Sequence, residues 1–239
     1  MTTHGMVWGA LLVVAMASGG CTAARMAVPS ELKGQAPALP VERHMGLTGG
    51  GSLRFGPHQV TDFQQGWTSA PGVKVSGVNL RAESTPYRFR STPEGEKTRA
   101  VECQVTRERI EAGGLEADVQ PRRVNCVIAA DGPEFPAGQF RLDHEPGRDL
   151  SNPHGRVTGR ARLGEVALEI ESSTRLEGGA SLAFAGFHLR QGERLVAAVE
   201  TLNEGRVWLA PDLTPEVRVL TVMVSSALLL DSGWQSPTE

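Results

Sequence analysis

Apolar and polar residues alternate in short stretches along most of the chain beyond residue 70. Alternation with a period of two predicts β-strands that bury one face, and the Gly, Pro, Asn and Asp residues between the stretches favour turns. The pattern predicts strands over Val73–Ala82, Arg99–Ile110, Leu115–Ala129, Gly155–Leu163, Val166–Leu176, Leu182–Leu189, Leu195–Leu202 and Arg206–Leu209.

Some of the predicted strands are joined by tight connections. Gln191-Gly192-Glu193 and Asn203-Glu204-Gly205 each lie between two extended stretches, as hairpin loops do. Short strands that are regularly spaced and joined in this way predict an antiparallel meander. The fold class is therefore mainly β, and the meander forms either a barrel or a sandwich.

One segment near the C-terminus has the pattern of a helix. Thr214 is a capping residue, Pro215 suits the first helical position and Glu216 places an acid in the first turn. The segment of about 215–230 is apolar on nearly every side, which predicts a helix packed in the core. It is shorter than the roughly 20 residues that cross a membrane as a helix. A β-strand is the alternative, because Val and Leu also suit a sheet.

The last fifty residues resemble the end of a known kind of domain. The stretch Leu195–Leu209, followed by the apolar helix, is similar to tubby-like domains, which include the LURP-one and scramblase-type domains. The resemblance implies a closed β-barrel around a central hydrophobic helix. Members of this group are associated with phosphoinositide or phospholipid binding, but no basic headgroup pocket is matched here, so no residue is assigned to lipid binding. A simple sandwich and a lipocalin-like barrel remain alternatives.

The N-terminus has the pattern of an export signal. Residues Val7–Ala17 form an apolar run that is too short to span a membrane but typical of a signal peptide. Small residues then lead into Cys21, which resembles the lipobox of bacterial lipoproteins. The resemblance implies cleavage before Cys21 and attachment of lipid to this cysteine. Ser18 stands where that family usually has Leu, and no Lys or Arg precedes the run. An ordinary secretory signal or a short anchoring helix is therefore the alternative.

These features divide the chain into three parts. Residues 1–20 are the predicted signal peptide, residues 21–51 are rich in Ala, Pro and Gly and predict a flexible tether, and residues 52–239 form a single β-rich domain. An irregular loop packed on the domain is the alternative to the tether. The expected location is the cell envelope, at the outer membrane, on its periplasmic side or at the surface.

Charge and composition restrict the partners. The net charge of −3 at pH 7 argues against a nucleic-acid partner. Arg160 and Arg162 alternate on one strand face, which indicates a solvated face more than a binding site. We expect no cofactor. The expected partners are a membrane, through the N-terminal lipid, and a lipid, glycan or protein ligand.

Two cysteines inside the domain predict a disulfide bond. Cys103 and Cys126 each lie in an alternating apolar run. If the two strands pair with residue 103 opposite 126, the turn centres near 114.5, where Gly113-Gly114 lies. An exported protein is in a compartment where such a bond persists. Two buried free thiols are the alternative, and we expect no metal site because partners at ligand spacing are missing.

The sequence gives little support for an enzyme. Nucleophile-elbow, zinc-protease and phosphate-loop motifs are absent from it. Asp143, His144, Asp149 and His154 lie in a polar, turn-rich stretch over 133–153, where an unrecognised catalytic site is the alternative function. Their convergence in one pocket would favour an enzyme. Without it, we expect a lipid-anchored binding or structural module with no catalytic residues.

Overall fold

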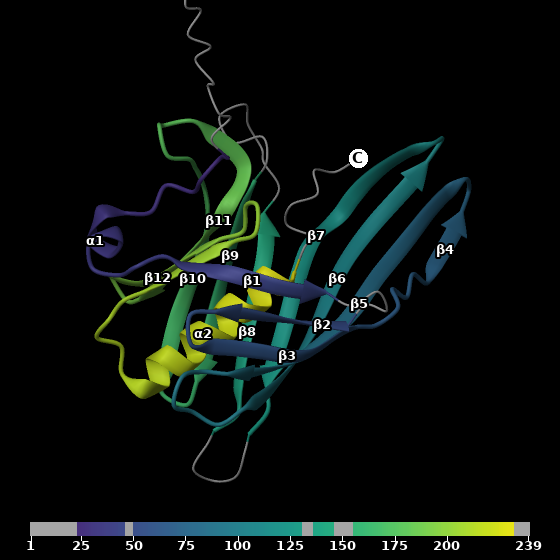
Figure 1. The fold of residues 1–239 in the computed structure, drawn as a ribbon. Coiled ribbons are helices and arrows are strands. Elements are labelled where there is room, and N and C mark those ends of the chain that lie inside the picture. The colour runs from purple at the N-terminus through teal and green to yellow at the C-terminus, as the bar shows by residue number, and fades with distance from the viewer. Residues whose placement is uncertain (1–22, 46–49, 131–135, 146–154, 232–239) are drawn as a thin grey trace, which may run out of the picture.

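The structure is a computed structural model that describes residues 23–45, 50–130, 136–145 and 155–231. Within these residues, one antiparallel sheet of thirteen strands accounts for most of the fold (Figure 1). The strands are β1 (Leu39–Met45), β2 (Gly50–Phe55), β3 (His58–Gln65), β4 (Gly72–Val75), β5 (Val78–Thr92), β6 (Arg99–Ala112), β7 (Leu115–Ile128), β8 (Gly138–Glu145), β9 (Arg156–Leu163), β10 (Val166–Arg175), β11 (Ser181–Gln191), β12 (Arg194–Glu200) and β13 (Arg206–Leu209).

The sheet closes on itself. Its order is β3-β2-β1-β13-β12-β11-β10-β9-β8-β7-β6-β5-β4, and β3 also pairs with β5. Twelve of the described strands therefore form a closed barrel, and β4 adds to β5 outside the closed ring. The predicted mainly-β meander is confirmed, and a barrel is the form that it takes.

Helix α2 (Pro215–Leu230) runs through the barrel and fills its core (Figure 1). The Thr214 hydroxyl accepts a hydrogen bond from the backbone N–H of Val217 at 3.5 Å, which caps the helix as its sequence predicts. Every residue from Val219 to Leu229 is buried, because strands surround the helix on all sides. The predicted buried helix is confirmed. Among the described residues, no helix combines the length and the apolar character needed to cross a membrane.

Residues 23–38, which we call the N-terminal strap, pack against the barrel. Met26 and Leu32 are 1% and 2% exposed, and Leu32 lies in the short helix α1 (Ser30–Lys33), which contacts β12. The chain then enters the barrel as β1, which pairs with β13 and β2. The prediction of a flexible tether over 21–51 is therefore wrong for its described part. The apolar residues of this stretch have no regular spacing, yet Met26, Leu32, Ala36 and Val41 are buried in the folded structure.

Two further expectations are corrected by the strand assignments. Val73–Ala82 holds parts of two strands, β4 and β5, joined by Ser76-Gly77 with φ values of 50° and 83°. Positive φ at both central residues is the geometry of a tight hairpin turn. The stretch 133–153 holds strand β8, which pairs with β7 and β9, where a polar loop was expected. In β8 only Phe140 and Leu142 alternate with polar residues, and the strand ends in adjacent charged and polar residues. The alternation is therefore too short to predict a strand from the sequence.

Strands β5, β6 and β7 continue beyond the barrel wall. The pairing of β3 with β5 covers residues 87–92, and that of β8 with β7 covers 123–128. Residues 72–83 and 107–120, which we call the extension, therefore form a four-stranded sheet of β4 to β7 outside the ring. Figure 1 shows it projecting away from the side of the barrel that carries α1.

Candidate functional site

Cys103 and Cys126 lie directly opposite each other on β6 and β7. Their sulfur atoms are 2.01 Å apart, and both side chains are buried in the barrel. The predicted register is confirmed. The turn at Gly113-Gly114 lies one residue before the expected midpoint of 114.5, because the register shifts between Thr106 and Arg109. The bond holds the wall of the barrel together at the base of the extension.

The carboxylate of Asp143 is held in an ion-pair cluster on the outer face of the barrel. Arg123 and Arg141 both donate hydrogen bonds to it at 2.7 Å. Burial alone would raise the pKa of Asp143, but the two guanidinium groups outweigh burial and hold this pKa below its ordinary value. An acid that stays ionised and paired in this way is suited to holding strands β7 and β8 together.

The cluster that the alternative enzyme hypothesis requires is not assembled by the residues that the structure describes. Asp143 and His144 are neighbours on β8, so their side chains point to opposite faces of the sheet. Asp149, His154 and the predicted lipidation site Cys21 lie outside the described residues. Elsewhere in the described chain, no three His, Cys, Asp or Glu residues are placed to hold a metal ion.

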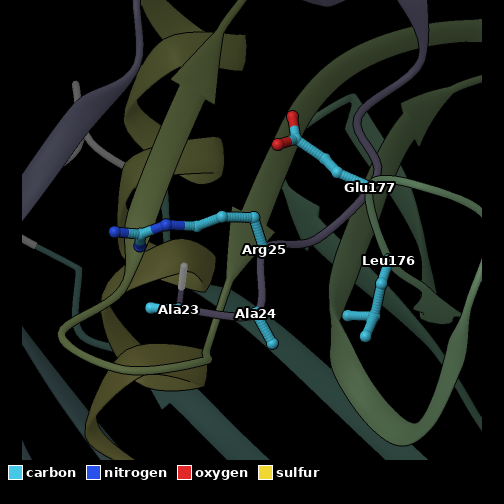
Figure 2. Close-up of a pocket in the computed structure, with 5 residues that line it drawn as sticks. All are labelled: Ala23, Ala24, Arg25, Leu176 and Glu177. Atoms are coloured by element: carbon cyan, nitrogen blue, oxygen red, sulfur yellow. The ribbon is translucent and has the colours of Figure 1, made fainter. Parts of the chain in front are cut away.

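An open hollow lies where the N-terminal strap meets the β10–β11 connection. Its lining consists of Ala23, Ala24, Arg25, Leu176 and Glu177 (Figure 2). In Figure 2 the Arg25 side chain points away from Leu176 and Glu177. It pairs instead with the buried carboxylate of Glu200 at 3.0 Å. The charged groups here do not converge on the hollow, so the contacts around it serve to dock the strap.

Glu200 on β12 is the residue to which the strap is fixed. It is 0% exposed, and its second oxygen accepts a hydrogen bond from the backbone N–H of Met26 at 2.9 Å. A buried carboxylate is stable only when paired and hydrogen-bonded, and the strap supplies both partners. The strap is also bonded to the β10–β11 connection through the bridge between Met26 and Leu176.

The extension carries the most unusual surface in the described chain. Val73, Val75, Leu80 and Leu115 are 65%, 63%, 43% and 79% exposed. Val73 is opposite Leu80, and Leu80 is opposite Ile110, so these side chains share one face of the sheet. We call Val73, Val75, Leu80, Ile110 and Leu115 the apolar face. Large exposed apolar surfaces on otherwise well-packed proteins commonly mark sites of interaction.

The opposite face of the extension is polar and internally paired. Arg107 donates to Asp118 at 2.7 Å, Arg109 lies 3.8 Å from Glu83, and Arg81 lies 3.6 Å from Glu111. These pairs join β5, β6 and β7 across the sheet. This face is therefore satisfied by water and by its own charges, whereas the apolar face is not.

The sequence pattern does not single out this candidate site. Alternation around Val73 and Val75 predicts that two faces of a strand differ, and it places the apolar side chains together. It does not say that the apolar face of these strands is left exposed to water. Comparisons of the chain with protein-family models, with curated proteins and with solved structures gave no match.

Proposed function

We propose that this chain is a lipid-anchored protein of the cell envelope whose barrel acts as a binding module. The apolar face of the extension carries the proposal, because it is a contiguous apolar surface that the rest of the described chain leaves exposed. The barrel needs no such surface for its own stability, since α2 already fills its core. The scatter of Asp143 and His144 to opposite faces argues against a catalytic role for this pair.

The docking of the strap supports the proposed anchor. Cys21 precedes Ala23, the first described residue, by two positions, and the strap is fixed to the barrel from Arg25 and Met26 onward. A lipid on Cys21 would therefore hold the barrel directly at the membrane surface, without a long tether. The paired cysteines at 103 and 126 suit an exported protein, since such bonds persist in oxidising compartments.

The likeness to tubby-like domains also remains part of the proposal. A closed barrel around a central apolar helix is the arrangement that the C-terminal sequence led us to expect. A shared fold does not carry a ligand with it, so the binding surface is assigned here from the exposed side chains of this chain.

The anchor is tested by labelling cells that express the full chain with a palmitate analogue. We expect the wild-type protein to be labelled and the Cys21→Ala variant to carry no label, because lipidation needs the cysteine thiol. Cys126→Ala serves as the matched control and should keep the label. A wild-type chain without label, or equal labelling of the Cys21→Ala variant, would end the lipoprotein proposal.

A further inference from the structure

We propose that the apolar face of the extension docks onto the surface of a lipid bilayer. The choice of a bilayer as the partner of this face rests on the proposed function, in which a lipid anchors the chain. The extension would then orient the barrel on the membrane.

The polarity of the sheet reverses between barrel and extension. Along β5, Tyr87 and Phe89 point into the barrel and are buried, whereas Arg88 is exposed on the outer face. The strand continues into the extension without a register shift against β6. Leu80 therefore continues the outer face and Arg81 the inner one. The outer face of β5 therefore carries charged side chains along the barrel and apolar side chains along the extension. The extension thus exposes apolar groups on the face that is polar in the rest of the sheet.

The extension is amphipathic, with one charged and one apolar face, and such a sheet can lie between water and lipid. Its charged face pairs internally through Arg107–Asp118, Arg109–Glu83 and Arg81–Glu111, so it can remain in water. Its other face presents branched apolar side chains and few groups that need water. Helices with one strongly polar and one apolar face lie flat in a membrane interface with the apolar side inward, and the burial of apolar area that holds them there would act on this sheet in the same way.

The position of the N-terminus favours a bilayer over other occupants. Strands β6 to β11 alternate in direction, so the β6–β7 and β10–β11 connections lie at the same end of the barrel. Met26 of the strap bridges Leu176 in the β10–β11 connection. The described residues nearest to Cys21 in sequence therefore lie at the end from which the extension projects. A lipid anchor there would bring the apolar face within reach of the same membrane.

An exposed aromatic residue adds to this arrangement. Trp67 is 96% exposed in the segment that leads from β3 into β4. Tryptophan is enriched at the level of lipid headgroups, where its ring is partly apolar and its N–H is hydrated. The net charge of −3 gives no reason to expect attraction to anionic lipid. We therefore expect contact through apolar insertion, with weak dependence on salt.

The test uses two adjacent positions on β4 that face opposite sides. In the full chain with Cys21→Ala, a polarity-sensitive fluorophore is placed at Val73→Cys or at Lys74→Cys, and phosphatidylcholine vesicles are added. We expect a blue shift at position 73, and quenching by nitroxide groups on the lipid acyl chains. The label at position 74 should show neither change. Since both proteins share the same N-terminus, any binding by the segment before residue 21 affects them equally.

A second variant measures how much the face contributes. The triple substitution Val73→Ser, Val75→Ser and Leu115→Ser should weaken vesicle partitioning by about tenfold or more, since each lost apolar group reduces the buried area. Lys74→Ser is the matched control and should bind as before. The thermal transition should hardly change, because the three side chains are exposed in the folded protein.

The contrary results are distinct. Equal signals at positions 73 and 74, or unchanged partitioning of the triple variant, would overturn the membrane role of this face. A blue shift at position 73 that appears without vesicles and grows with protein concentration would assign the face to a second copy of the chain. Because Cys21 is absent from this experiment, failure of lipidation in cells cannot cause any of these outcomes.

Discussion

His58 is a buried titratable residue at the start of β3. It is 3% exposed, and its Nδ1 accepts a hydrogen bond from the backbone N–H of Glu94 at 3.0 Å, which requires the neutral ring. Burial lowers the pKa of His58 to about 4, with Glu94 opposing the shift and Arg218 adding to it. The side chain therefore contributes to stability in its uncharged form.

This residue makes the stability of the barrel depend on pH. Below pH 6.5 the unfolded chain takes up a proton at residue 58 that the folded chain does not, so stability falls as the pH drops from 6.5 to about 4. The loss from this one group is about 3 kcal/mol at most. Chemical denaturation at a series of pH values should show a shallower fall for His58→Asn than for wild type.

The exposed His44 provides the control for that measurement. His44→Asn should reproduce the wild-type pH profile, because His44 lies in water on β1. Identical profiles for wild type and His58→Asn would show that His58 does not remain neutral in the folded barrel.

At the scale of elements, the β6–β7 hairpin joins the barrel wall to the extension. Its barrel half is fixed by Cys103 and Cys126, and its outer half by ion pairs such as Arg107–Asp118. The hairpin thus passes from an apolar environment inside the ring to a solvated one outside it. The cross-link lies where the sheet loses the support of α2.

The disulfide bond should be demonstrable in protein isolated without reductant. Peptide mapping without reductant should recover a peptide pair joined through Cys103 and Cys126, and reduction should lower the free energy of unfolding by roughly 3 kcal/mol. A variant with both Cys103→Ala and Cys126→Ala should be insensitive to reductant. Two thiols that alkylate freely in the folded protein isolated without reductant would contradict the bond.

At the scale of the whole molecule, the strap ties the N-terminal part of the described chain to the barrel. Residues 23–38 cover the outer face of β12, while α2 covers its inner face, so every residue from Leu195 to Glu200 is buried. The strap and the helix therefore enclose the same strand from two sides. Loss of the strap would expose β12 and lengthen the link to Cys21.

Glu200→Gln should loosen this attachment. The substitution removes the charge that pairs with Arg25 and should lower the free energy of unfolding by roughly 2 kcal/mol. Trypsin should also cleave after Arg25 faster than in wild type. Glu177→Gln is the control: its pair with Lys33 is exposed, and its loss should cost less than about 0.5 kcal/mol. Equal effects of the two substitutions would show that the strap is held by other contacts.

Local patterns were enough to predict some parts of this molecule from sequence. The cap and buried character of α2, the β6–β7 register with Cys103 opposite Cys126, and most strands after residue 99 follow from side-chain period and turn chemistry. Each of these is decided by residues that lie close together in the chain. They therefore leave a signal that one sequence can show.

Tertiary structure alone decided the closure of the barrel, the docking of the strap and the exposure of the apolar face. Met26 is buried because β12 and Gly186 lie beside it, some 160 residues away in sequence. Val73 is exposed because the pairing of β3 with β5 that closes the ring ends at Tyr87, so β4 lies outside the ring, and no period along β4 records that. Alternation shows that a strand has two different faces, but the position at which the ring closes determines whether the apolar face is packed against the core or left exposed to water.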